Sequence, residues 1–273
     1  MAQKLNYLLT QGCSLLLWPF QKLPPFWSIL FLSLLTSLFV LAVYRAVSDP
    51  VRVRNAKNQI KAHILAIRLY RDSWRVIVVS FFKSLFYTGK YFALNLLPLL
   101  LAFPLLFLLF VQMDIRFGMR PFRVGEDIVV KARFSRAIGP LDVTLEQGPL
   151  FRAAMKPVFI DALGEVNWKL RAVEKGMTNV VIRVDGAAIQ KNLAIGEMLA
   201  ALSNKKMAAS TWAHFIYPAE KLLAPALPLT SVALHYPPRS IAFLGLSGHW
   251  LYFYLALTMV IALALKNRFG VEF

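Results

Sequence analysis

Three long stretches of apolar residues constrain this fold more than any other feature of the sequence. They cover residues 27–44, 91–113 and 246–265, and none contains Asp, Glu, Lys or Arg. A helix of about 20 apolar residues is long enough to cross the hydrocarbon core of a bilayer. Hydrophobic residues also make up 58% of the chain, above the roughly 45–50% of a soluble domain. We therefore expect an α-helical integral membrane protein with about three transmembrane helices.

The first apolar stretch is expected to stay as an anchor. A signal peptide has an apolar run of only about 7–15 residues, and small residues mark its cleavage site. Here the run is longer, and it ends with Tyr44 and Arg45.

The distribution of charge predicts the orientation. The chain has a formal net charge of +17, and residues 45–90 contain ten Lys or Arg against two Asp. Because short cytoplasmic loops are rich in Lys and Arg, we place this loop in the cytoplasm. The N-terminus and residues 114–245 are then outside, and the tail is inside. The basic balance thus reflects a membrane topology, and no DNA partner is expected.

The cellular setting is inferred from what the sequence lacks. Cys13 is the single cysteine, so no intramolecular disulfide can form, and no Asn-x-Ser/Thr sequon occurs. These features favour a multi-pass protein of a bacterial inner (plasma) membrane.

The chain divides into eight segments. They are an interfacial amphipathic helix (1–25), a transmembrane helix (26–46), a basic cytoplasmic helical hairpin (47–90), a second transmembrane helix (91–113), an extracytoplasmic β-sandwich (114–196), a membrane-proximal irregular or helical segment (197–245), a third transmembrane helix (246–265) and a cytoplasmic tail (266–273). For residues 1–25, a flexible leader is the alternative to an interfacial helix.

The basic hairpin follows one helical pattern. Apolar residues recur in alternating steps of four and three, which is the spacing of a coiled-coil seam. The seam consists of Ile60, Ile64, Ile67, Arg71, Trp74, Val78, Phe81 and Leu85. Since no Gly or Pro intervenes between Ile60 and Gly89, we expect one helix that continues almost into the second span and packs against a returning leg at residues 48–58. Lys61, Arg68 and Arg75 form a basic stripe beside the seam, suited to anionic lipid, ribosomal RNA or a client.

Beyond the second span, the pattern changes to the two-residue period of β-strands. The expected strands are Asp127–Phe134, Asp142–Gln147, Glu165–Val173, Thr178–Val184 and Ala188–Ile195, separated by turns that contain Gly. This spacing favours an inserted all-β immunoglobulin-like sandwich, with Trp168 in its core. After it, Met198–Thr211 is predicted to be helical, and five prolines interrupt the following stretch.

Catalytic signatures are absent from the sequence. The four histidines show no metal-ligand spacing, no phosphate-binding glycine loop occurs, and no pair of acids stands out. We therefore expect no enzyme activity, no metal and no cofactor.

Polar residues inside the spans are candidates for function, because polar groups are costly in lipid. They are Ser33, Thr36 and Ser37 in the first span and Asn95 and Gln112 in the second. One interpretation is a shallow polar groove that opens to the cytoplasm, with Arg45 and Lys90 near its mouth. The alternative is that these groups stabilise helix–helix packing.

The order of these parts resembles the core of the YidC/Oxa/Get/EMC superfamily of membrane-protein insertases. Residues 1–113 match its external amphipathic helix, first span, basic cytoplasmic hairpin and returning span, and the third span corresponds to the third core helix. In that family, a polar groove lets clients enter the bilayer. Two features depart from the pattern. The first span lacks the groove arginine of YidC-type members, and a β-sandwich between the last two spans is not a usual core feature.

The resemblance implies an insertase-like or chaperone-like protein. The groove would contain Ser33, Thr36, Ser37, Asn95 and Gln112, and the client or lipid contacts would be Arg45, Lys61, Arg68, Arg71, Arg75 and Lys90. The implied partners are the lipid bilayer, nascent or unfolded membrane proteins and the ribosome. The alternative is a membrane-anchored scaffold or binding subunit whose external sandwich recognises an envelope protein.

Overall fold

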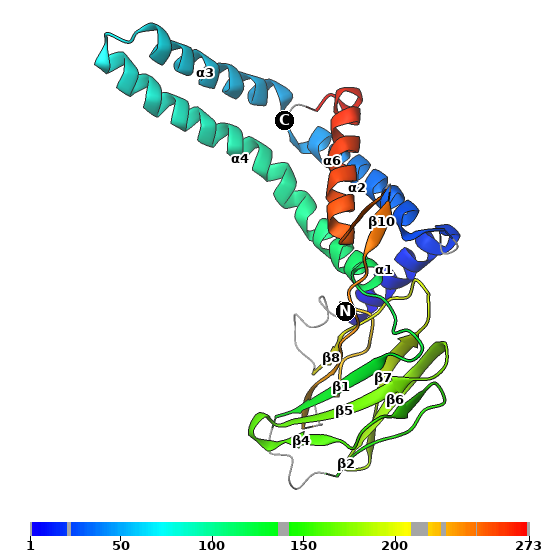
Figure 1. The fold of residues 1–273 in the computed structure, drawn as a ribbon. Coiled ribbons are helices and arrows are strands. Elements are labelled where there is room, and N and C mark those ends of the chain that lie inside the picture. The colour runs from blue at the N-terminus through cyan, green and yellow to red at the C-terminus, as the bar shows by residue number, and fades with distance from the viewer. Residues whose placement is uncertain are drawn as a thin grey trace. The chain divides into compact units, whose positions relative to one another are not determined.

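The computed structural model describes residues 2–20, 23–135, 142–208, 218–224, 228–243 and 245–271, without the side chains of residues 2–9. The chain forms two compact units (Figure 1). The sheet unit comprises Met1–Ser28 and Leu108–Trp250, and the helix unit comprises Ile29–Phe107 and Leu251–Phe273.

The helices have the following bounds. They are α1 (Ala2–Leu17), α2 (Pro25–Val47), α3 (Pro50–Leu69), α4 (Trp74–Met113) and α6 (Trp250–Phe269). A short 3-10 helix, η1 (Trp18–Phe20), follows α1, and a π-helical turn, η2 (Asp114–Gly118), extends α4. Another 3-10 helix, η3 (Asp161–Leu163), lies between strands.

Three of these helices are long and apolar enough to cross a membrane, as expected. They are α2, α4 together with η2, and α6. The third begins later than expected, because Leu246–Gly248 forms strand β11, which pairs with β10 (Ile241–Phe243). Gly245 lies in the turn between these strands with φ +81°, a conformation that favours glycine.

The antiparallel sheets expected outside the spans are confirmed. Their strands are β1 (Asp127–Phe134), β2 (Val143–Leu145), β3 (Phe151–Ala153), β4 (Val158–Ile160), β5 (Glu165–Ala172), β6 (Gly176–Val184), β7 (Ala187–Ile195), β8 (Lys205–Met207) and β9 (Leu229–Leu234). One sheet has the order β3-β5-β1-β9-β8, with β4 also paired to β5, and a second has the order β2-β6-β7. Side chains from both sheets form one hydrophobic cluster, which includes Val130, Trp168 and Leu193.

Alternation along the strands explains this core. In β1, Ile128, Val130, Ala132 and Phe134 are buried and the residues between them are more exposed, as a two-residue period requires. Trp168 is buried among them, as expected. The helix expected at Met198–Thr211 is wrong for its described residues, which include β8, and residues 209–211 lie outside the described part.

Glu165 joins two cationic neighbours on the first sheet. It lies opposite Arg133 in the β1–β5 register, accepts hydrogen bonds from this arginine, and its Oε2 is 3.2 Å from Lys131 Nζ. The hydrogen bond from Arg133 and the charge of both partners hold the pKa of Glu165 below its ordinary value. A carboxylate with a lowered pKa stabilises the fold above its unfolded pKa, and this contribution is lost as the pH falls through the folded value.

We predict that Glu165→Gln lowers the thermal unfolding midpoint at neutral pH, because it removes these charged hydrogen bonds. The difference between wild type and variant should shrink as the pH falls from about 5 to about 3, where the wild-type carboxyl takes up its proton. Thermal unfolding of the full chain across this range measures the effect. Glu174→Gln, at an exposed position, is the matched control. A difference independent of pH would contradict the prediction.

Candidate functional site

The α3–α4 hairpin is the first candidate site in the helix unit. Asp49 caps α3 by accepting hydrogen bonds from the amides of Val51 and Arg52, and Pro50 occupies the first turn, where its missing amide proton costs nothing. The helix then ends at Leu69, and a new one begins at Trp74. The expectation of one helix through residues 60–85 is therefore wrong, and the chain reverses at residues 70–73 (Figure 1). Tyr70 and Ser73 close this turn through a backbone hydrogen bond.

The two legs of the hairpin contact each other through a ring stack and a cation–π pair. The rings of His63 and Tyr87 stack with centroids 5.7 Å apart, and Lys57 Nζ lies 5.5 Å from the ring centroid of Tyr91. Ala56 and Ser80 are buried. Of the predicted seam, Ile60 and Ile67 on α3 are partly buried.

The α4 part of the predicted seam faces outward. Trp74, Val78, Phe81 and Leu85 are exposed by 75, 43, 56 and 59%, and Phe82 beside them is exposed by 62%. Spacings of three and four residues place all five side chains on one face of the helix. We call this face, made of Trp74, Val78, Phe81, Phe82 and Leu85, the outward stripe.

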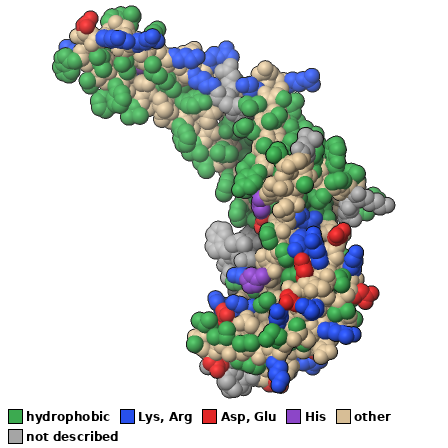
Figure 2. Space-filling view, viewed as in Figure 1, with side chains coloured by type: hydrophobic (Ala, Val, Ile, Leu, Met, Phe, Trp, Pro, Cys, Tyr) green, Lys and Arg blue, Asp and Glu red, His purple; other side chains and the backbone are tan. Residues whose placement is uncertain are grey.

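Basic side chains border the hairpin. Lys61, Arg68, Arg71, Arg75 and Lys90, all predicted contact residues, are exposed. Figure 2 shows basic side chains along one edge of the hairpin and hydrophobic side chains along another. Arg45, at the end of α2, lines an open pocket of about 350 Å³ that Tyr44, Ser48 and residues 267–271 also border.

The predicted groove hydroxyls of α2 are buried against α6. Ser33, Thr36 and Ser37 are exposed by no more than 5%. Ser37 donates to the carbonyl oxygen of Thr258 at 3.0 Å, and the hydroxyl of Tyr254 donates to Thr36 Oγ1 at 3.0 Å. We call this set of contacts the hydroxyl seam, and it corresponds to the helix-packing alternative for these residues.

The two predicted groove residues of α4 have different surroundings. Asn95 donates to the carbonyl oxygen of Tyr91, and its own carbonyl oxygen accepts from the hydroxyl of Tyr44. Its side-chain Oδ1 is buried without a hydrogen-bond partner among the described residues. Gln112 belongs to the sheet unit, where its side chain contacts Thr10 and Arg116.

Arg116 is a buried cation that the sequence analysis missed. It lies in η2, is exposed by 4%, and donates to Gln112 Oε1, the carbonyl oxygen of Thr10 and Ser14 Oγ at 2.7, 2.9 and 3.0 Å. It closely follows the apolar run of residues 91–113, and no local sequence pattern marks its partners. The π-helical turn instead continues α4, and the guanidinium group fastens α1 to it.

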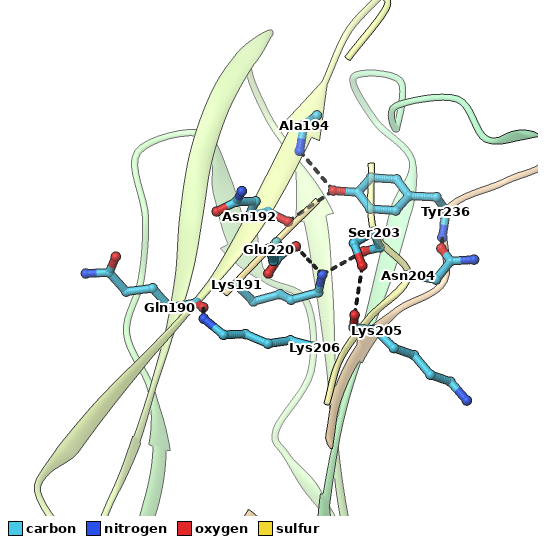
Figure 3. Close-up of polar contacts among 10 residues, drawn as sticks. All are labelled: Gln190, Lys191, Asn192, Ala194, Ser203, Asn204, Lys205, Lys206, Glu220 and Tyr236. Carbon is cyan, nitrogen blue, oxygen red and sulfur yellow. Dashed lines mark hydrogen bonds and ion pairs between the residues drawn. The ribbon is translucent and has the colours of Figure 1, made fainter. Parts of the chain in front are cut away.

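A second missed feature is a buried ion pair in the sheet unit (Figure 3). Lys191 of β7 is fully buried and donates to Glu220 and, at 2.6 Å, to the carbonyl oxygen of Ser203. Burial lowers the pKa of Lys191, and the charge of Glu220 opposes that shift. Nearby, the Tyr236 hydroxyl accepts from the amide of Ala194 and donates to the carbonyl oxygen of Asn192, both at 3.1 Å. These hydrogen bonds hold Ser203, Glu220 and Tyr236 against strand β7.

Neither unit shows a metal-binding cluster of His, Cys, Asp and Glu among the described residues. No protein-family model, curated protein or solved structure matches this chain.

We predict that Glu220→Gln destabilises β7 by about 3–5 kcal/mol, because it leaves a buried ammonium group without its counter-charge. The double variant Lys191→Met with Glu220→Leu should recover most of this loss, since it removes both charges. Hydrogen exchange of the β7 amides, read by mass spectrometry, measures local opening. Lys205→Met, at an exposed neighbour, is the matched control. A double variant as unstable as Glu220→Gln would contradict the pairing.

We also predict that Thr36→Val and Tyr254→Phe each destabilise the α2–α6 contact by about 0.6 kcal/mol and by no more than about 1.7 kcal/mol, the average and the maximum for hydrogen bonds between membrane helices. The double variant should cost less than the sum, because both changes remove one bond. Unfolding of the full chain in mixed detergent micelles measures these losses. Tyr70→Phe, which makes the same change at an exposed position, should have no effect. Additive losses would contradict a shared bond.

Proposed function

We propose that this protein is an insertase-like or chaperone-like membrane protein that holds apolar segments of membrane-protein clients on its α3–α4 hairpin. The observation that carries this proposal is the outward stripe. Its five large apolar side chains are each at least 43% exposed, although the seam pattern is that of a packing surface. Contiguous exposed apolar patches commonly mark interaction sites.

The length of α4 supports this proposal. Its 40 residues extend about 60 Å at 1.5 Å per residue, twice the ~30 Å hydrocarbon core of a bilayer. With residues 91–113 in the bilayer, the outward stripe lies on the cytoplasmic side, continuous with a span. A client held there remains next to the helix that enters the membrane.

The basic border gives the hairpin a second kind of contact. Lys61, Arg68, Arg71 and Arg75 attract anionic lipid headgroups, which adds about 1 kcal/mol for each basic residue near the surface. In this proposal the hydroxyl seam holds α2 and α6 together. Asn95 supplies the remaining polar group of the groove, since its Oδ1 has no partner in the described structure.

The sheet unit is proposed to contain an immunoglobulin-like sandwich on the outer side of a bacterial inner membrane. A scaffold or binding role for this sandwich is the second candidate function. It is favoured by exposed apolar residues at and beside strand β4, namely Met155, Val158, Phe159 and Leu163. An edge strand with apolar side chains can pair with a partner.

Photo-crosslinking in cells distinguishes the two functions. We predict that probes at Val78 and Phe82 capture nascent membrane proteins, and that a probe at Phe159 does not. The double variant Val78→Ser with Phe82→Ser should lower capture from a probe at Leu85 by at least about ten-fold, because burial of each such side chain contributes roughly 1.5–3 kcal/mol.

The matched control is Met155→Ser with Leu163→Ser, which removes two exposed apolar side chains from the sheet unit. It should leave capture at Leu85 unchanged. Capture of one discrete folded partner at Phe159, with none at the outward stripe, would reject the insertase proposal and support the scaffold.

A further inference from the structure

An open pocket of about 330 Å³ in the sheet unit is lined by three arginines. Arg120, Arg123 and Arg239 come from two separate segments of the chain, and Glu197 is the acidic residue of the lining. The lining therefore carries an excess of positive charge.

Two of these arginines are held in place by the fold. Arg239 Nε donates to the carbonyl oxygen of Met119 and its Nη2 donates to that of Met198, both at 3.0 Å. Arg120 forms a bidentate salt bridge with Glu126, with N–O distances of 3.0 and 2.8 Å. A guanidinium group that is already fixed loses less rotational freedom when it binds a ligand.

Arg239 retains unused donors and an uncompensated charge. A guanidinium group has five N–H donors, and only two of its nitrogens bond within the described part of the chain, both to neutral carbonyl oxygens. Burial and the nearby charge of Arg120 lower the pKa of Arg239. An anion in the pocket would relieve this repulsion.

The pocket lies at the start of a candidate span. Leu23 and Pro25 line it, and Pro25 is the first residue of α2. If α2 crosses the bilayer, as proposed above, the pocket lies at the depth of the lipid headgroups. Arginine is well suited to phosphate there, because its planar fork binds two oxygens at once.

We propose that this pocket binds a phosphate group, presented by a phospholipid headgroup or as free phosphate, between Arg123 and Arg239. Arg120 is paired with Glu126, so Arg123 and Arg239 supply the charge, and Glu197 in the lining opposes the anion.

The test uses the full chain in an uncharged, phosphate-free detergent. Affinity is measured for dihexanoyl phosphatidylglycerol, inorganic phosphate and dihexanoylglycerol, which lacks phosphate. We expect Arg123→Gln to weaken phosphatidylglycerol binding by about five-fold or more and Glu197→Gln to strengthen it by about two-fold, as charge-assisted bonding requires. Arg123 is exposed and its side chain makes no hydrogen bond in the described structure, so its replacement should leave folding intact.

The matched control is Arg152→Gln, which removes the same charge from the exposed strand β3. It should leave the affinity unchanged. If Arg123→Gln weakens the binding of phosphatidylglycerol and wild type does not bind inorganic phosphate, the pocket is a headgroup site. If Arg123→Gln weakens the binding of inorganic phosphate to the same extent, the pocket is a free-phosphate site. Equal affinities for wild type, Arg123→Gln and Glu197→Gln, or equal binding of dihexanoylglycerol, would overturn the proposal.

Discussion

A polar group in hydrocarbon must find its hydrogen-bond partner inside the protein, and this constraint governs the helices that are apolar enough to span a membrane. Ser33, Thr36 and Ser37 of α2 satisfy it through α6. Ser37 bonds to the carbonyl oxygen of Thr258, and Tyr254 bonds to Thr36. Each such bond contributes modestly. Together they fix which face of α2 meets α6, so the remaining faces are available to lipid or to α4.

The hairpin differs from the candidate spans in its contacts. Its legs contact each other through the stacked rings of His63 and Tyr87 and through Lys57 over the ring of Tyr91. The large side chains of the outward stripe remain exposed in the described part of the chain. In water this surface would be costly, and this cost is the reason why we propose that a client segment of similar hydrophobicity binds there.

The sequence predicts the elements of this fold better than their contacts. The three spans follow from length and composition, and β1, β5, β6 and β7 follow from alternation of apolar residues, because these are local properties. The break after Leu69 was missed, since no Gly or Pro marks it. The seam pattern correctly identifies one face of α4, but periodicity alone does not reveal what that face contacts.

The buried charges could not be predicted either, because their partners lie far away in the sequence. Lys191 occupies an inward position of β7, where its alternation with Ile189 and Leu193 would predict an apolar residue. Its partner, Glu220, lies 29 residues away on an irregular segment, and no local pattern connects the two. Arg116 likewise depends on acceptors more than 100 residues earlier in the chain.

These buried charges also distinguish the sheet unit from the helix unit. Arg116 and the Lys191–Glu220 pair are both in the sheet unit, and each connects segments that are far apart in the sequence. Buried ion pairs add little net stability, but they can select one arrangement over others. The helix unit has the opposite character, with a weakly joined hairpin and an exposed apolar face. An exposed apolar face of this kind is compatible with the proposed binding of clients of varied sequence, because an apolar helical surface can bind many segments without a fixed complement.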